Sequence, residues 1–131
     1  MKEKKLPKII EEVGFDFSWD EKKVWKLNYP VEEINIEELT WHFEIPFHWH
    51  GSQIYNLKSI EIISNPDNYK EEYERTMKSD LTHPIDIMWN KGKWLILDGL
   101  HRLMKAKILG LRKVKVRKIP RLEVPNILKD D

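Results

Sequence analysis

Hydrophobic and polar positions follow clear patterns in the C-terminal third of the chain. Residues 94–97 form a continuous apolar run, which predicts a strand buried on both faces. Residues 113–119 alternate between apolar and basic side chains, so a half-buried strand is expected there. Between these runs, apolar residues at helical spacing predict a helix that stops before Gly110. The predicted order is a strand over 84–89, a turn over 90–93, a strand over 94–97, a helix over 100–109 and a strand over 113–119.

The middle of the chain is predicted to hold a strand and two helices. Two isoleucines share one face of a strand over 31–39, which leads into a short turn. A short helix is expected over 57–64. Asn65 as a cap and Pro66 as a first helical residue then favour a new helix. Its apolar residues lie four apart and form one stripe toward the core: Tyr69, Tyr73 and Met77.

The N-terminal part of the chain is interpreted as an appendage to the main domain. Pro7 and Gly14 bracket a short helix. Ser18 and Glu21 have the spacing of a capping box, which predicts a second helix over about 19–27. The expected division is an N-terminal helical extension over 1–30 and one domain over 31–131.

The order of elements after residue 83 predicts the fold class. Strand, turn, strand, helix and strand give an α+β domain, with a small mixed sheet and flanking helices. The chain has 131 residues, of which 40% are hydrophobic. That length suits one domain with a core of its own.

Composition excludes several classes of protein. The chain has no cysteine, which excludes a disulfide scaffold, a Cys-ligated metal site and a thiol nucleophile. No apolar run approaches the roughly 20 residues that span a bilayer, and charges interrupt the apolar run of the N-terminus. We therefore expect a cytoplasmic protein without a membrane partner. The Lys-, Glu- and Ile-rich usage is typical of a thermophile, and equally of an AT-biased genome.

Charge is segregated along the chain although the formal net charge is only +1. Residues 31–74 carry ten acids and two bases, whereas residues 101–121 carry nine bases and no acid. Concentrated positive charge favours phosphate, so the 101–121 block indicates a nucleotide or a nucleic acid. The alternative is a solvated surface on which these bases pair with the acidic block.

The segment Asp98-Gly99-Leu100-His101-Arg102 carries the strongest chemical signal. It lies where a buried strand ends and a helix begins, so free backbone N–H groups and the positive end of the helix dipole suit an anion. Gly99 admits a close approach of the ligand, and Arg102 can bind phosphate oxygens through two parallel hydrogen bonds. Asp98 is a candidate metal ligand or a partner of His101. The alternative is a tight turn with Asp98 as the N-cap.

This segment and its surroundings resemble the ParB/sulfiredoxin superfamily. Gly99 and Arg102 match the G-x-x-R pattern of ParB N-terminal domains, and the DG-x-HR form is closer to sulfiredoxin and to archaeal free serine kinases. Lys105, Ala106, Leu109-Gly110 and the strand over 114–119 continue the likeness. The resemblance is specific over about residues 83–120, looser over residues 31–82 and absent over residues 1–30.

The resemblance implies that the chain binds a nucleotide, ATP, ADP or CTP, together with Mg²⁺. Asp98 would bind the metal ion, and the phosphate-binding residues would be Gly99, Leu100, His101, Arg102 and Lys105. Two departures restrict what carries over. Leu100 stands where sulfiredoxin has its catalytic Cys, so sulfinic acid reduction is excluded. About ten residues follow the resembling segment, so centromere partitioning, which needs further domains, is not expected.

An enzyme of this kind also needs a group that positions or deprotonates the acceptor hydroxyl. The candidates are His42, Glu44 and Asp98, and Glu44 lies roughly where kinases of this fold carry a catalytic acid. A surface role for Glu44 is the alternative. His48 and His50 flank Trp49 and could together bind a metal.

The leading hypothesis is a magnesium-dependent phosphoryl-transfer enzyme, either a kinase acting on a small-molecule acceptor or a nucleotide hydrolase. Two alternatives stay open. One is a nucleic-acid-binding protein or ParB-like nuclease that binds DNA or RNA through the 101–121 block. The other is a non-enzymatic regulator controlled by a bound nucleotide.

Overall fold

The computed structural model describes residues 8–130 except 16, 51 and 52, and side chains except at 49–50 and 53–55. Its strands are β1 Val31–Asn35, β2 His48–His50, β3 Gln53–Leu57, β4 Ile85–Asn90, β5 Lys93–Asp98 and β6 Lys113–Lys118. Its α-helices are α1 Lys8–Glu12, α2 Glu21–Trp25, α3 Ser59–Ser64, α4 Lys70–Lys78, α5 Leu100–Ile108 and α6 Val124–Ile127. Three 3₁₀ turns complete the chain: η1 Ile36–Glu38, η2 Thr40–Glu44 and η3 Arg121–Glu123.

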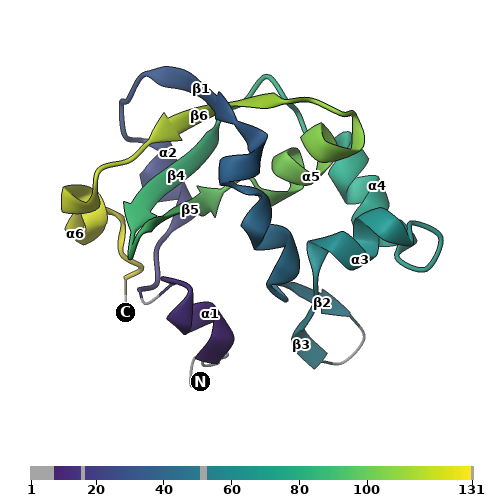
Figure 1. Ribbon diagram of the computed structural model, residues 1–131. Coiled ribbons are helices and arrows are strands. Elements are labelled where there is room, and N and C mark those ends of the chain that lie inside the picture. The colour runs from purple at the N-terminus through teal and green to yellow at the C-terminus, as the bar shows by residue number, and fades with distance from the viewer. Residues whose placement is uncertain (1–7, 16, 51–52, 131) are drawn as a thin grey trace.

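The main sheet has the strand order β1-β6-β4-β5 (Figure 1). β4 and β5 form an antiparallel hairpin, and α5 then leads the chain across to β6, which lies parallel to β4. β1 pairs antiparallel with β6 at the opposite edge, and β2 pairs with β3 in a separate two-stranded sheet. The predicted α+β class with a small mixed sheet is therefore confirmed.

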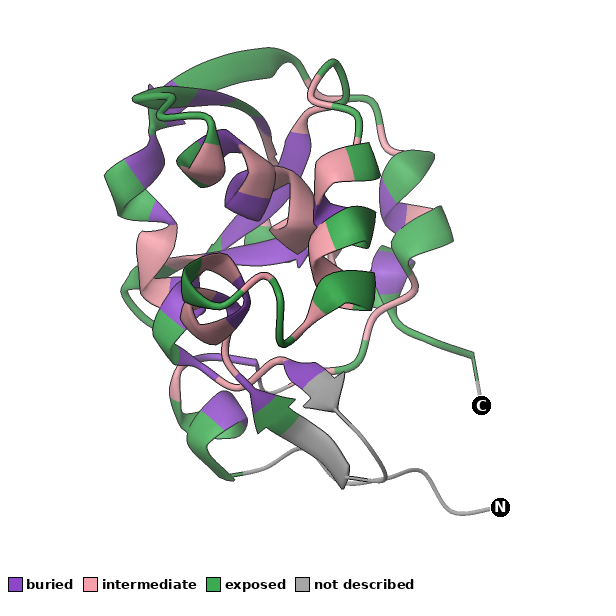
Figure 2. Cartoon of the chain, turned by 90° about the vertical axis from the view of Figure 1, so that its right-hand side faces the viewer, coloured by how far each residue is buried: buried purple, intermediate pink, exposed green. Residues whose placement is uncertain are grey.

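The two faces of the main sheet are covered by different helices. On one face, Ile87 and Ile96 pack with Ile62 of α3 and Leu103 of α5. On the other face, five buried residues from α2, α6 and the sheet pack together: Val24, Met88, Leu97, Ile119 and Ile127. Figure 2 shows the buried positions on the strands and on the sides of the helices that face them. The apolar run of β5 arises from this double cover, whereas β6 alternates because Lys113 and Lys115 on one of its faces are exposed.

The described residues before 31 pack against the main sheet. Val24 of α2 is fully buried against the sheet, and Ile10 of α1 packs beside Leu95 of β5. These N-terminal residues cover apolar surface that the strands would otherwise expose to water, which is unfavourable at about 25 cal/mol per Å². The described part of the extension belongs to the same packed body as the sheet.

Two helices begin later than the sequence predicts. The N-cap of α2 is Asp20, whose carboxylate accepts from the Lys22 N–H at 2.9 Å, and not Ser18. α4 begins at Lys70, because Asn65 ends α3 and the Pro66 carbonyl accepts a hydrogen bond from the Tyr69 N–H. Asn and Pro favour helix starts and turns alike, so local sequence does not separate the two.

The 101–121 block does not act as one free basic surface. Arg117 points inward, where its guanidinium donates to Asp86 at 2.6 Å and to the Leu27 carbonyl at 2.6 Å. Lys118 Nζ lies 3.3 Å from Glu32 Oε1. The Lys118–Glu32 pair joins the basic block to the acidic 31–74 block, as the alternative interpretation expected, whereas Arg117 pairs with Asp86 outside that block.

The described helices include none with both the length and the apolar composition that crossing a bilayer requires.

Candidate functional site

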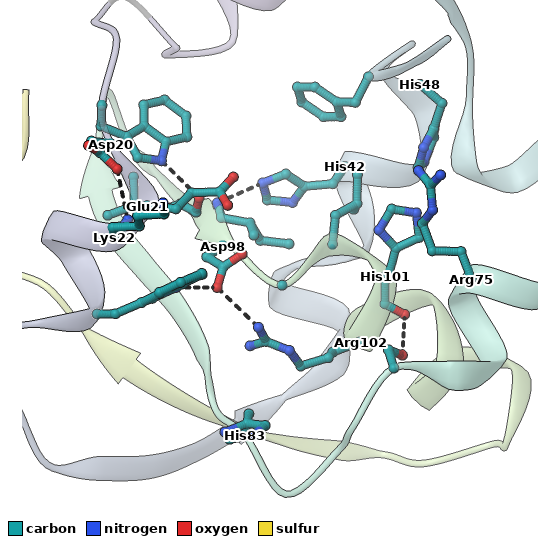
Figure 3. A pocket seen from close by; sticks show the side chains of 18 of the residues that line it. Asp20, Glu21, Lys22, His42, His48, Arg75, His83, Asp98, His101 and Arg102 are labelled. Atoms are coloured by element: carbon teal, nitrogen blue, oxygen red, sulfur yellow. Dashed lines mark hydrogen bonds and ion pairs between the residues drawn. The ribbon is translucent and has the colours of Figure 1, made fainter. Parts of the chain in front are cut away.

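A cleft of about 1590 Å³ opens where β5 passes into α5 (Figure 3). One wall is the N-terminal segment around α2, including Glu21 and Trp25. The opposite wall is α4 and the loop after it, including Arg75. The floor is the segment over 98–102, so the predicted phosphate segment lines this cleft.

Gly99 shapes the floor of the cleft because no other residue fits its conformation. It has a φ of +119°, in the left-handed region that favours glycine. A Cβ there would lie 3.1 Å from Arg102 Nη1 and 3.1 Å from Ile85 Cγ1. Gly99 is itself the N-cap of α5, and no side chain caps the helix. The first turn of α5 therefore presents uncapped N–H groups at the cleft, and the alternative with Asp98 as the N-cap is wrong.

Arg102 is held in place across the floor by two oxygen acceptors. Its Nη2 donates to Asp98 Oδ2 at 3.0 Å, and its Nη1 donates to the Pro84 carbonyl. Trp25 Nε1 also donates to Asp98 Oδ2, at 2.7 Å, from the far side of the cleft. Both bonds to Asp98 reach the same oxygen, so they leave Oδ1 as the second oxygen of this carboxylate for another ligand.

Glu21 is a second carboxyl on the floor side of α2. Partial desolvation, and then the negative charge of Asp98, raise the pKa of Glu21. Two carboxylates that repel each other beside an arginine are a donor set suited to a hard divalent cation such as Mg²⁺. The residues present thus fit the magnesium ion that the resemblance implies, with Asp98 as the expected ligand and Glu21 as a second carboxyl near it.

His101 lies in the first turn of α5 but reaches toward α4. Its Nε2 is 3.0 Å from Glu72 Oε2, and its ring centroid is 5.5 Å from that of His48 (Figure 3). Leu100 lines the cleft beside it. The structure therefore brings Gly99, Leu100, His101 and Arg102 to one cavity, with His101 engaged by an acid of the neighbouring helix.

Lys105 lies outside the cleft lining. Its Nζ donates to the Ser79 carbonyl at 2.8 Å, at the C-terminal end of α4. A cation at this end satisfies a free carbonyl and the negative end of the helix dipole. Its phosphate-binding role stays a prediction that this position does not support.

His42 and Glu44, two of the predicted catalytic residues, lie in different environments. His42 lies in the cleft wall, but Nδ1 bonds the Leu39 carbonyl at 2.6 Å and Nε2 accepts from the Ile96 N–H at 3.0 Å. Burial lowers the pKa of His42 to about 3, so the ring is neutral and both nitrogens are occupied. Glu44 is exposed and is not among the residues that line the cleft. Their catalytic roles stay predictions without geometric support, and the side chain of His50 lies outside the described residues.

Four cleft or near-cleft residues were not predicted from the sequence: Glu21, Trp25, Glu72 and Arg75. Glu21 was assigned only to a capping box, and Glu72 was given no role. Both reach the site through packing of α2 and α4 against the sheet and α5. The one local signal was the Trp and acid pattern over residues 19–25, which is rich in groups suited to a cleft wall.

Comparison with known proteins returned few matches. No family model matches the chain, and no curated protein matches it. A search of solved structures found sulfiredoxin from Arabidopsis thaliana, with 18% sequence identity and a TM-score of 0.36, over 73% of this chain and 93% of that one.

Proposed function

We propose that the cleft binds a nucleotide together with Mg²⁺, with the phosphates at the segment from Gly99 to Arg102. The observation that carries this proposal is the uncapped first turn of α5, which opens at the floor of the cleft beside the Arg102 guanidinium. Backbone N–H groups at a helix start bind phosphate oxygens, and the helix dipole adds to the attraction. Arg102 is already oriented by Asp98 and Pro84, so binding orders little additional side chain.

The charges around the cleft favour a nucleotide that carries its own cation. The lining holds seven acidic residues against five lysines and arginines. A bare polyphosphate would be repelled by Asp98 and Glu21, whereas a magnesium complex offsets the charge of both partners. Asp98 would hold the ion through Oδ1, and the ion would neutralise charge on the phosphates.

Trp25 offers a surface for the base of the nucleotide. It lines the cleft and is 54% exposed, although its Nε1 is bonded to Asp98. An exposed indole that is fixed at one edge gives a flat face on which a base can stack, a contact worth about 1–3 kcal/mol in nucleic-acid complexes. Stacking does not distinguish bases, so this wall is compatible with ATP, ADP or CTP.

Phosphoryl transfer to a small-molecule hydroxyl, or to water, is the reaction that this arrangement supports. Arg102 and the first-turn N–H groups would stabilise charge on the transferred group. Glu21 would accept the proton of the attacking hydroxyl, because its raised pKa brings the carboxyl closer to the operating pH of a base. This role for Glu21 replaces those first considered for His42 and Glu44.

Calorimetric titration with the Mg²⁺ complexes of ATP, ADP and CTP tests the proposal. We expect at least one of them to bind, and Arg102→Ala to weaken that binding about 10- to 100-fold, since a charged hydrogen-bond partner is worth about 1.5–3 kcal/mol. Arg112→Ala is the matched control, because Arg112 is an exposed base of the same block. It should leave the affinity unchanged.

The stability of the variants must be checked because Arg102 also bonds Asp98 and Pro84. Arg102→Lys keeps the charge and loses the planar fork, so it should weaken binding while folding normally. No binding by any of the three nucleotides, or equal binding by both Arg102 variants and the wild type, would overturn the proposal. Phosphorus NMR of the bound nucleotide then separates turnover from a long-lived complex.

A further inference from the structure

His48, Glu72 and His101 come from three separate elements and meet at one point. They lie on β2, α4 and α5, and each offers one ligand atom. His101 Nε2 is 3.0 Å from Glu72 Oε2, and His48 Nδ1 is 3.7 Å from the same oxygen. The three ligand atoms all lie within 4.8 Å of one another. We propose that this cluster binds one divalent transition-metal ion, with Zn²⁺ as the expected ion.

The donor set selects the class of metal. Two imidazoles and one carboxylate are ligands that Zn²⁺ accepts with a fourth position left open, whereas Mg²⁺ and Ca²⁺ prefer oxygen alone. Ligand atoms about 2.0–2.1 Å from a tetrahedral ion are separated by roughly 3.3–3.4 Å. The two separations from Glu72 Oε2, 3.0 and 3.7 Å, bracket that value, and the two histidine ligand atoms lie within 4.8 Å of each other. Binding the ion therefore requires the two imidazoles to turn toward a common centre beside Glu72.

The hydrogen bonds around the cluster orient the ligands in the way that a metal site needs. His48 Nε2 lies 2.8 Å from the Ser59 hydroxyl, and Ser59 is fully buried. This bond occupies one ring nitrogen and leaves Nδ1 toward Glu72. Metal-bound histidines almost always bond a partner through the nitrogen that does not face the metal. Arg75 reaches the other oxygen of the carboxylate, with Nη1 3.3 Å from Glu72 Oε1.

The cluster is shielded from water and still reachable from the cleft. The side chains of His48, Glu72 and His101 are 5%, 19% and 30% exposed. His48 and His101 line the cleft, so a small molecule or water bound there can reach an open position on the ion (Figure 3). An ion held here adds a positive charge next to the first turn of α5.

This site does not depend on nucleotide binding. Its ligands exclude Asp98, Gly99 and Arg102, and although His101 belongs to the phosphate segment, its side chain turns to Glu72 of α4. The variants that test the cluster, at Glu72 and His48, leave the phosphate segment unchanged. The cluster and the nucleotide proposal can therefore fail separately, and each has its own measurement.

The test uses the full chain without an affinity tag, stripped with a chelator and titrated with Zn²⁺ alone against a chromogenic competitor. We expect one equivalent of tightly bound Zn²⁺. Glu72→Gln keeps the size and hydrogen bonding of the side chain and removes its charge, and it should weaken Zn²⁺ binding by more than about tenfold. His48→Ala should do the same, and Ser59→Ala should cause a smaller loss because it only releases the ring of His48.

His83→Ala is the matched control. His83 also lines the cleft, but its side chain is 69% exposed and its partner is Asp80, 3.6 Å away. It should bind Zn²⁺ like the wild type. Substitution with Co²⁺ provides a second readout, because its visible absorption should show nitrogen ligands in the wild type and in His83→Ala but change in Glu72→Gln.

Two results would overturn the proposal. One is a wild-type chain that binds no Zn²⁺, in which case the cluster is a hydrogen-bonded His–Glu–His network only. The other is Zn²⁺ binding that is unchanged in both Glu72→Gln and His48→Ala, which places the metal elsewhere. Circular dichroism of each variant checks that it folds, and nucleotide affinity of Glu72→Gln shows whether the two sites are separate.

Discussion

The main sheet has two edges, and they are protected from further strand pairing in different ways. At the β1 edge the strand is short and carries exposed acids, with Glu32 3.3 Å from Lys118 on the neighbouring strand. At the β5 edge the backbone is covered by side chains. His42 accepts from the Ile96 N–H at 3.0 Å, and Trp19 Nε1 donates to the Leu97 carbonyl at 2.8 Å.

The two kinds of edge protection differ in whether they allow the edge to be buried away from water. Charge on a short strand keeps an edge in water and unattractive to other strands. Side chains that bond the backbone satisfy the buried N–H and C=O groups of the edge and allow it to be dry. The β5 edge can therefore form the inner wall of the cleft, and the residues that cover it, His42 and Trp19, both line that cavity.

The largest expected effect is a pH dependence of stability that arises from His42. Burial lowers the pKa of His42 from 6.5 to about 3, so the folded state keeps the ring neutral. Its contribution is present above pH 6.5 and is lost as the pH falls, because the unfolded chain then binds a proton that the folded chain rejects. Between pH 7 and pH 5 this group alone removes about 2 kcal/mol from the free energy of unfolding. Urea unfolding at the two pH values measures it.

The variant His42→Gln is compared with the wild type in the same unfolding measurement. The amide of the new side chain can accept from the Ile96 N–H and donate to the Leu39 carbonyl, but it does not titrate. His48, whose pKa burial lowers to about 4, contributes in the same pH range and remains in the variant. The acid sensitivity of His42→Gln should thus be smaller than that of the wild type. Equal loss of stability in the two proteins would contradict the role of His42 at this edge.

The second effect concerns Trp19 at the same edge. Trp19→Phe keeps a ring against Phe15 and Phe17, whose centroids lie 5.8 and 5.4 Å away, but removes the donor to the Leu97 carbonyl. We expect a loss of about 1–2 kcal/mol in the free energy of unfolding, since a buried acceptor is left without its partner. Trp89→Phe is the control, because Trp89 is 52% exposed on the neighbouring strand. If Trp19→Phe lost no more stability than Trp89→Phe, the Trp19 hydrogen bond would not contribute to protecting the β5 edge.

The smallest effect is expected at the β1 edge. A double-mutant cycle with Glu32→Gln and Lys118→Ala should give a coupling free energy below about 1 kcal/mol, because both side chains are more than a third exposed. The coupling should disappear in 1 M salt, where charges are screened beyond about 3 Å. A large coupling that persists in salt would show that this edge is not held by solvated charge.

The sequence predicts the part of the fold whose signals are local. The hairpin, α5 and β6 begin and end within about two residues of their predicted bounds, because apolar alternation and the glycines at 99 and 110 act on their own neighbours. The start of α4 was predicted too early for the opposite reason: Asn65 and Pro66 serve the end of α3. Which helix a turn residue serves is decided by packing.

The residues of the candidate site likewise divide into those with a local signal in the sequence and those that only packing brings to the site. Gly99 and Arg102 were predictable because a glycine and an arginine at a strand-to-helix junction have a chemical meaning by themselves. Glu72 was not, since it is 29 residues from His101 and reaches it only when α4 packs on α5. Lys105 was assigned to phosphate through the resemblance, and its bond to the Ser79 carbonyl could not be predicted because a backbone carbonyl leaves no signal in the sequence.

The segment around α2, which forms one wall of the cleft, is joined to the far end of the chain. Trp19 forms a bridge with Leu128, and the Asp20 N–H donates to the Ile127 carbonyl at 2.8 Å. During synthesis this wall therefore cannot be completed until residues more than 100 positions later in the sequence have left the ribosome. A nascent chain can form the hairpin and α5 early, but it completes this wall of the cleft only after residues 127 and 128 have emerged.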